Sequence, residues 1–227
     1  RSQCKHKNMS NSKPVPPDAL LLLTTQCPHC PAVLQGLSGL VKQGLIGRLE
    51  VVNIVARPDI ARQQGVRTVP WMRLGDFELE GLHSPAELRL WAERAGSEAG
   101  LAEYYTDLFR HGRLPKALAA IRKYPGHMPA LLALAEDPDT ELTVRIGVSA
   151  VMEDAAGSAL LQNQMSALIN LARHTDPRVR SDACHFLALT RNEAAIAVLE
   201  NLTQDPEPAV QAVARDSLEE LREYLPT

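Results

Sequence analysis

The sequence is poor in cysteine, in long apolar runs and in net charge. Four cysteines among 227 residues are too few for a small secreted scaffold that disulfides hold together. No stretch approaches the ~20 consecutive apolar residues that a membrane-spanning helix needs. The formal net charge is −3. We therefore expect a soluble globular chain with no membrane partner, long enough for one large domain or two ordinary ones.

The small net charge conceals an uneven distribution. Residues 1–97 carry 12 basic and 8 acidic side chains, a net charge of +4. Residues 98–227 carry 12 basic and 19 acidic side chains, a net charge of −7. An acidic second half argues against nucleic acid as a partner, because nucleic acid is itself a polyanion.

The first residues differ from the rest of the chain. Residues 1–8 are basic and polar, and Met9 looks like a native start. We predict a disordered leader over residues 1–14, with Cys4 in a tag or an upstream extension. The apolar run Ala19–Leu23 is too short for a signal peptide. We therefore predict a cytoplasmic protein, or a periplasmic one if a signal sequence was removed before Arg1.

The most informative motif is Cys27-Pro28-His29-Cys30, directly after the apolar run Ala19–Thr24. A strand that leads into Cys-x-x-Cys places two thiols at the first turn of a helix, where free backbone N–H groups and the helix dipole favour a thiolate. Cys30 shares a helix face with Cys27, so it can attack a mixed disulfide that Cys27 forms. His29 favours the thiolate further if it is protonated, or it is a solvated bystander.

Strand and helix patterns alternate around this motif, in the order β-α-β-α-β-β-α. The last helix has a strong start, because Ser84 is a capping residue, Pro85 follows it and Glu87 stands three residues after the cap. The predicted elements are a strand over 19–24, a helix over 31–43, a strand over 49–55, a helix over 57–64, strands over 66–74 and 77–80, and a helix over 84–95.

Residues 15–95 resemble the thioredoxin-like family, close to its small thioredoxin- and glutaredoxin-like redox proteins. The matching residues are the Cys27–Cys30 motif, Thr68-Val69-Pro70 and Glu80-Gly81. The resemblance implies an α/β thioredoxin fold, with Cys27 as the exposed nucleophile and Cys30 as the resolving thiol. It also implies that Pro70 is in cis and forms the surface against which a substrate chain lies.

The neighbours of Pro70 are further candidate contacts. We name Val69 and Trp71 as substrate-binding residues, although Trp71 also suits a role in packing. Two positions depart from the family pattern: Leu21 stands where thioredoxins carry a buried Asp, and Gln26 replaces the usual aromatic residue. The Pro-His pair between the cysteines resembles that of bacterial periplasmic disulfide oxidases, which are strong oxidants. The direction of electron flow stays open.

Other interpretations of the same residues remain. Cys-x-x-Cys can be half of a zinc site, but no second pair of ligands has matching spacing, so we predict no metal. A thioredoxin-like domain can also dock partners without turnover, since fold does not imply function. The four arginines between residues 57 and 73 form either a basic rim or a solvated face; they are Arg57, Arg62, Arg67 and Arg73.

After the small, polar stretch Gly96–Gly100, strand patterns end and helical patterns continue to the end of the chain. Three Asp-Pro pairs, at residues 137, 176 and 205, are predicted to open helices with Asp as the cap. A similar short sequence motif follows each pair. Its first valines, Val144, Val179 and Val210, lie 35 and 31 residues apart. This spacing is typical of stacked helix pairs.

Residues 100–225 resemble HEAT-type repeats, most clearly at Asp176–Arg180. Nothing here looks catalytic: we interpret the Arg and Asp residues at repeat positions as ties between repeats, and Cys184 as a small buried residue. Such helical solenoids commonly present an extended surface to another protein.

We therefore predict a thioredoxin-like domain over residues 15–96 and a HEAT-like helical domain over residues 97–227. The function would be thiol–disulfide exchange with a protein client that the helical repeats select, with a reductase or thiol pool to recycle Cys27 and Cys30. No cofactor is implied. The alternative is a non-catalytic adaptor that uses the thioredoxin-like domain as a docking surface.

Overall fold

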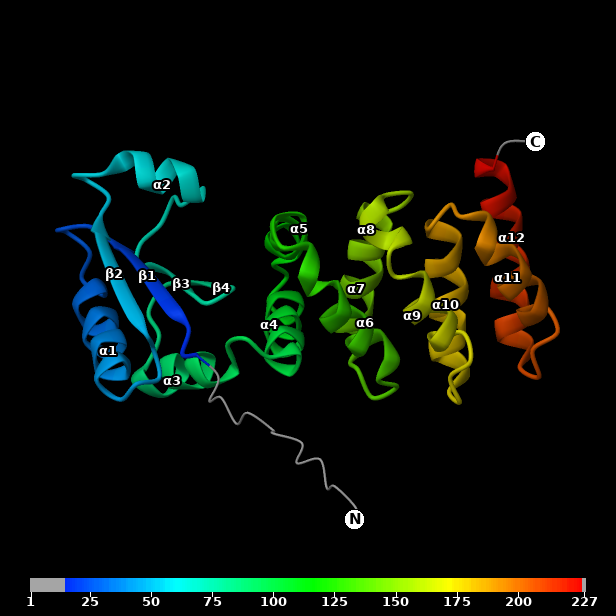
Figure 1. Cartoon of the computed structure of the whole chain (residues 1–227), viewed down its shortest axis with the longest axis horizontal. Coiled ribbons are helices and arrows are strands. Elements are labelled where there is room, and N and C mark those ends of the chain that lie inside the picture. The colour runs from blue at the N-terminus through cyan, green and yellow to red at the C-terminus, as the bar shows by residue number, and fades with distance from the viewer. Residues whose placement is uncertain (1–14, 226–227) are drawn as a thin grey trace, which may run out of the picture. The chain divides into compact units, whose positions relative to one another are not determined.

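The computed structural model describes residues 15–225. The predicted leader, residues 1–14 with Cys4, lies outside them. The chain divides into two compact units, Arg1–Gly96 and Ser97–Thr227, and Figure 1 labels the elements of each. Within residues 15–225, no helix is both long enough and apolar enough to cross a membrane.

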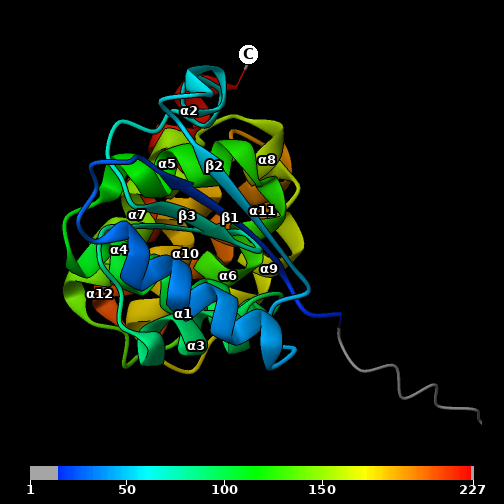
Figure 2. The same cartoon turned by 90° about the vertical axis from the view of Figure 1, so that its left-hand side faces the viewer.

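The first unit contains a four-stranded mixed sheet in the order β2-β1-β3-β4. β1 is parallel to β2 and antiparallel to β3, which in turn is antiparallel to β4. In Figures 1 and 2 the sheet lies between α2 on one side and α1 and α3 on the other. The strands are β1 Asp18–Leu23, β2 Arg48–Asn53, β3 Trp71–Leu74 and β4 Phe77–Glu80, and the helices are α1 Cys30–Lys42, α2 Pro58–Gln64 and α3 Pro85–Arg94.

The predicted element order is confirmed, and β1 is buried on both faces. Leu20 and Leu22 pack with Trp71 on the face toward Ile60 of α2. Leu21 is fully buried and points to the opposite face, because successive strand side chains alternate. The predicted cap of α3 is also present: the Ser84 hydroxyl accepts the Glu87 N–H at 3.2 Å, and the Glu87 carboxylate accepts the Ser84 N–H at 2.7 Å.

The third strand was predicted too long. The prediction covered residues 66–74, but β3 begins at Trp71. Pro70 has no N–H to give to a strand ladder. The Pro70 carbonyl instead accepts the Gly81 N–H at 2.8 Å. Residues 66–70 therefore form an irregular segment that leads from α2 into the sheet.

The second unit is helical throughout its described part. α4 begins at Glu98, so most of the predicted linker at 96–100 is the first turn of a helix, and Ser97 caps it by accepting the Gly100 N–H at 3.0 Å. The helices are α4 Glu98–Arg110, α5 Leu114–Lys123, α6 Met128–Glu136, α7 Leu142–Asp154, α8 Ala159–Gln162, α9 Met165–Leu171, α10 Pro177–Leu189, α11 Ile196–Leu202 and α12 Pro208–Tyr224, with short 3₁₀ turns at Pro125–His127 and Glu193–Ala195.

Only one of the three Asp-Pro pairs opens a helix as predicted. Asp176 caps α10, whereas Asp137 lies at the end of α6 and Asp205 lies three residues before α12. The three aspartates share a local turn. In each, the carboxylate accepts the backbone N–H two residues later, at 2.8 to 2.9 Å. The repeated dipeptide therefore predicted a turn correctly and the start of the helix wrongly.

Charged residues at repeat positions tie successive repeats together. Arg180 on α10 makes a two-pronged ion pair with Asp205 at 2.8 Å, with 12% and 5% of the two side chains exposed. Arg145 on α7 pairs with Asp182 on α10 through one guanidinium nitrogen and donates to the Asp137 carbonyl at 3.1 Å through another. The repeated sequence motif that contains these arginines also contains valines that are buried in the core, Val144, Val179 and Val210.

Candidate functional site

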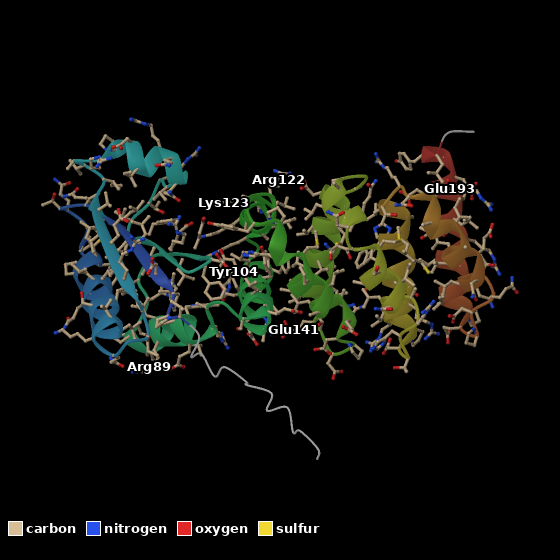
Figure 3. The ribbon with its side chains drawn as sticks, viewed as in Figure 1. Arg89, Tyr104, Arg122, Lys123, Glu141 and Glu193 are labelled. Carbon is tan, nitrogen blue, oxygen red and sulfur yellow. A yellow bond between two sulfur atoms is a disulfide. The ribbon has the colours of Figure 1, made fainter. Side chains whose placement is uncertain are left out.

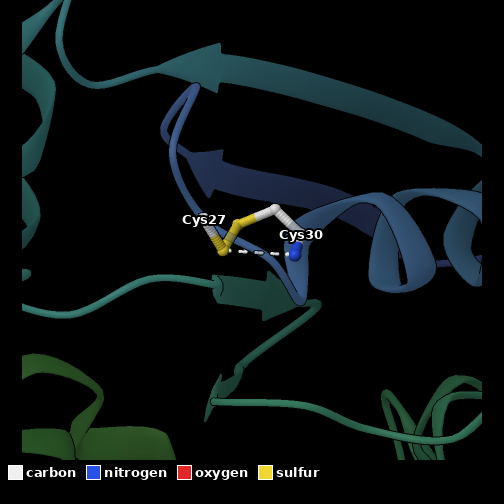
Figure 4. The surroundings of a disulfide bond; sticks show 2 residues. All are labelled: Cys27 and Cys30. Carbon is white, nitrogen blue, oxygen red and sulfur yellow. Dashed lines mark hydrogen bonds between the residues drawn. A yellow bond between two sulfur atoms is a disulfide. The ribbon is translucent and has the colours of Figure 1, made fainter.

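The two motif cysteines form a disulfide in the loop between β1 and α1 (Figure 4). The sulfur atoms are 2.13 Å apart and the Cα atoms 5.5 Å apart. A turn at the end of β1 brings Cys27 into place, where its N–H donates to the Thr24 carbonyl at 3.4 Å. The pair therefore lies at the edge of the sheet at which β1 ends.

The start of α1 provides a hydrogen-bond donor to the first sulfur. The Cys30 N–H donates to Cys27 Sγ at 3.1 Å. α1 begins at Cys30, so Cys27 precedes the helix instead of lying in its first turn as predicted. In the reduced protein, the same N–H and the positive end of the helix dipole would stabilise a thiolate at Cys27.

The two cysteines differ in their exposure to solvent. Cys27 is half-buried and His29 beside it is exposed, whereas Cys30 is 2% exposed. His29 occupies the capping position of α1, but its side chain makes no cap hydrogen bond. An incoming sulfur atom can therefore reach Cys27 more easily than Cys30, which is the asymmetry that sequential attack by two thiols requires.

The strand register brings Pro70 to the same edge of the sheet. Leu22 of β1 pairs with Trp71 of β3, so Pro70 precedes β3 at the level where β1 ends. Figure 4 shows the segment that enters β3 beside the disulfide. The Val69–Pro70 peptide bond is cis.

The three residues predicted to contact a substrate differ in exposure. Pro70 is buried and Val69 is half-buried. Trp71 is 3% exposed and packs against the cluster of Leu20 and Leu22. The structure thus gives Trp71 a packing role, which was the other role proposed for it.

Asn53 was missed by the sequence analysis. It ends β2, and its side chain donates to the Thr25 hydroxyl at 3.4 Å and accepts the Val55 N–H at 3.0 Å. It therefore joins the loop that carries Cys27 to the segment that leads into α2. An asparagine inside the strand predicted over residues 49–55 was the available signal, because Asn is depleted in strands and its side chain often bonds to backbone groups two residues on.

The four arginines between residues 57 and 73 fall into two groups. Arg57 makes a two-pronged pair with Asp59, at 3.0 and 2.7 Å, which lowers the pKa of that carboxyl. Arg73 donates to the Gln64 side chain at 3.3 Å. Arg62 and Arg67 are exposed, and their guanidinium groups have no hydrogen-bond or ion-pair partner among residues 15–225.

Cys184 in α10 contrasts with the pair. It is fully buried, and burial raises the pKa of its thiol to about 12. A thiol that stays protonated and out of contact with solvent is inert. Among the described residues, no group of three or more His, Cys, Asp or Glu side chains is placed to hold a metal ion.

Comparison with known proteins identifies part of the helical region. No curated protein matches the chain. A family model for HEAT repeats matches residues 155–219, a segment that holds α8 to α11 and most of α12. The chain therefore contains HEAT repeats over residues 155–219, within a longer helical region.

Proposed function

We propose that residues 15–96 form a thioredoxin-like module for thiol–disulfide exchange and that the helical region selects or docks its protein client. The observation that carries the proposal is the Cys27–Cys30 disulfide, whose more accessible sulfur accepts a hydrogen bond from the start of α1. This environment suits a thiol that must leave and attack as a thiolate.

Three further features support the module. The elements follow the order β-α-β-α-β-β-α, the strands lie in the order β2-β1-β3-β4, and Pro70 precedes β3 at the edge where β1 leads to Cys27. The element order and the place of Pro70 agree with the expectation of a thioredoxin-like fold, which is part of this proposal. The buried Leu21 leaves the middle of β1 without an acidic group to move a proton, because Asp18 lies at the other end of the strand and pairs with Arg48. Solvent or His29 would therefore move the proton.

The proposed reaction conserves atoms and electrons. A client thiolate attacks Cys27 Sγ, the Cys27–Cys30 bond breaks, and its electron pair leaves on Cys30. A second client thiolate then attacks the client sulfur of the mixed disulfide and expels the Cys27 thiolate. Two electrons pass from the client to the protein, and the two protons lost by the client thiols balance those that Cys27 and Cys30 take up. The same steps in the reverse direction reduce a client disulfide.

The helical region offers a surface for the client. Leu142 and Ile146 lie one turn apart on α7 and are 73% and 60% exposed. The ion pairs Arg145–Asp182 and Arg180–Asp205 are used within the repeats, so their charges are not available for a partner. An exposed apolar pair on a rigid repeat is a suitable contact for a protein segment.

Trapping with Cys30→Ser tests this function. Without the resolving thiol, a mixed disulfide between Cys27 and a protein with an accessible disulfide should persist and appear as a reducible conjugate. The control is the double variant Cys27→Ser, Cys30→Ser, which should form none. If Cys30→Ser folds like the wild type and forms no conjugate, the exchange proposal fails and the adaptor alternative is favoured.

A further inference from the structure

The edge of the sheet that carries the disulfide also carries positively charged side chains. β1 ends in the loop to Cys27, β2 ends at Asn53 and leads into α2, and the segment at residues 66–70 returns from α2 to β3. In the parallel pair of β1 and β2, Leu23 lies opposite Asn53, so both strands end at the same level. α2 and the returning segment therefore border the site.

Positive charge predominates in this border. Residues 53–73 contain four arginines and one acidic residue, Asp59. Asp59 already neutralises Arg57, and Arg73 bonds to Gln64. The exposed guanidinium groups of Arg62 and Arg67 therefore have no partner among the described residues. We call Arg62 and Arg67 the α2 rim.

The other charged residues of the sheet lie away from the end of β1 that leads to Cys27. Arg48 and Asp18 pair with each other at 3.1 Å, at the opposite end of β1 and β2. Glu80 ends β4 opposite Trp71, so it lies on the far side of β3 from β1. Glu50 of β2 and Glu78 of β4 lie on the sheet face that α2 covers, but both are level with Leu20, three residues before β1 ends. The end of the sheet beside Cys27 is thus basic on its α2 side and has Glu80 on its β4 side.

We propose that the α2 rim recognises carboxylates that flank the reacting cysteine of a protein client. The preferred substrate would be a cysteine pair with Asp or Glu side chains a few residues away, on the part of the bound chain that faces α2. Two exposed guanidinium groups bind carboxylates through paired hydrogen bonds and accelerate the approach of an anionic segment. This inference rests on the proposed exchange function.

Single-turnover exchange with short dithiol peptides tests the inference. The full chain, oxidised at Cys27–Cys30, would be mixed anaerobically with peptides whose two cysteines are flanked by Glu, Gln or Lys, and the loss of peptide thiols followed. Flanking charges also change the reactivity of the peptide thiols themselves. Each rate is therefore divided by the rate of the same peptide with the uncharged hydroxyethyl disulfide.

The corrected rate for the Glu peptide should exceed that for the Lys peptide about tenfold at low ionic strength. The difference should nearly vanish at 1 M salt, where the screening length falls to about 3 Å. Arg62→Gln together with Arg67→Gln should remove most of the difference and leave the rate of the Gln peptide unchanged.

The matched control removes two positive charges from the same unit at another place. Arg48→Gln with Arg89→Gln changes the net charge equally, and Figure 3 shows Arg89 beside α3, on the side of the sheet away from α2. This variant should keep the preference for the Glu peptide. An equal loss of preference in both double variants, or equal wild-type rates for all three peptides, would contradict the proposal that the α2 rim recognises carboxylates. A failure to oxidise any peptide would instead overturn the exchange function itself.

Discussion

The two units of this chain use cysteine and charge in opposite ways. In the first, a cysteine pair lies at the edge of a sheet, where the Cys27 sulfur is partly accessible and accepts a backbone hydrogen bond. In the second, Cys184 is buried in α10, and the ion pair of Arg180 with Asp205 is buried between repeats. The same residue types thus lie within reach of solvent in the first unit and are enclosed by packing in the second.

The largest expected effect separates the two kinds of cysteine. Cys27→Ser should reduce disulfide exchange to the uncatalysed background, because the accessible sulfur is gone. Cys184→Ala should leave the exchange rate unchanged and lower only the stability of the helical unit, by about 1 kcal/mol for a small cavity. The measurement is single-turnover oxidation of a dithiol peptide. A Cys184→Ala variant that folds but loses exchange activity would contradict the claim that Cys27 is the reactive cysteine and Cys184 is inert.

The next effect tests whether the charges of the helical unit are architectural. Asp205→Ala leaves the Arg180 guanidinium buried with only the carbonyls of His174 and Thr175 as partners. We expect a loss of about 3 kcal/mol in the free energy of unfolding of the helical unit, measured by urea titration. Asp176→Ala removes an exposed pair and a helix cap and should cost about 1 kcal/mol. Equal costs for the two variants would show that burial of the pair is unimportant.

The same ion pair predicts a dependence on pH. Arg180 holds the pKa of the Asp205 carboxyl below its ordinary value. A lowered folded-state pKa contributes stability that is present above the unfolded pKa of ~3.9 and is lost as pH falls through the lower folded value. The stability difference between wild type and Asp205→Asn should therefore be constant between pH 5 and 7 and shrink below about pH 4. A stability difference that grows as the pH falls would contradict a lowered pKa of Asp205 in the folded protein.

The smallest effect concerns the helix that supports the sheet of the first unit. Ser84→Ala removes the cap of α3 and should cost about 1 kcal/mol in the stability of that unit, while Ser84→Thr, which keeps the acceptor, should cost less. Exchange at Cys27 should be unaffected in both. The measurement is urea unfolding followed by a signal from the first unit, such as the fluorescence of Trp71 and Trp91.

Much of this organisation could be predicted from the sequence, because it depends on local patterns such as hydrophobic periodicity and capping residues. The order of elements in the first unit, the cap at Ser84 and the helical character of the second unit were all predicted. The start of β3 was not, because a segment rich in β-branched residues looks like a strand until the missing N–H of Pro70 is considered. Asn53 was missed because its bond to Thr25 joins residues 28 apart in sequence.

Two of the three Asp-Pro predictions failed for a related reason. The dipeptide determines a turn over two residues, but the helix that follows begins later, at Leu142 after Asp137 and at Pro208 after Asp205. The partners of Arg145 and Arg180 were likewise set by the packing of helices and not by spacing alone.

The most direct test of the account is the pKa of Cys27 in the reduced protein. Alkylation rates measured across pH, with the modified cysteine identified by mass, should give a midpoint clearly below the free thiol value of ~8.5, because the Cys30 N–H and the start of α1 favour the thiolate. Cys184 should react only after unfolding. A Cys27 midpoint at or above ~8.5 would contradict the claim that this pair is built for disulfide exchange.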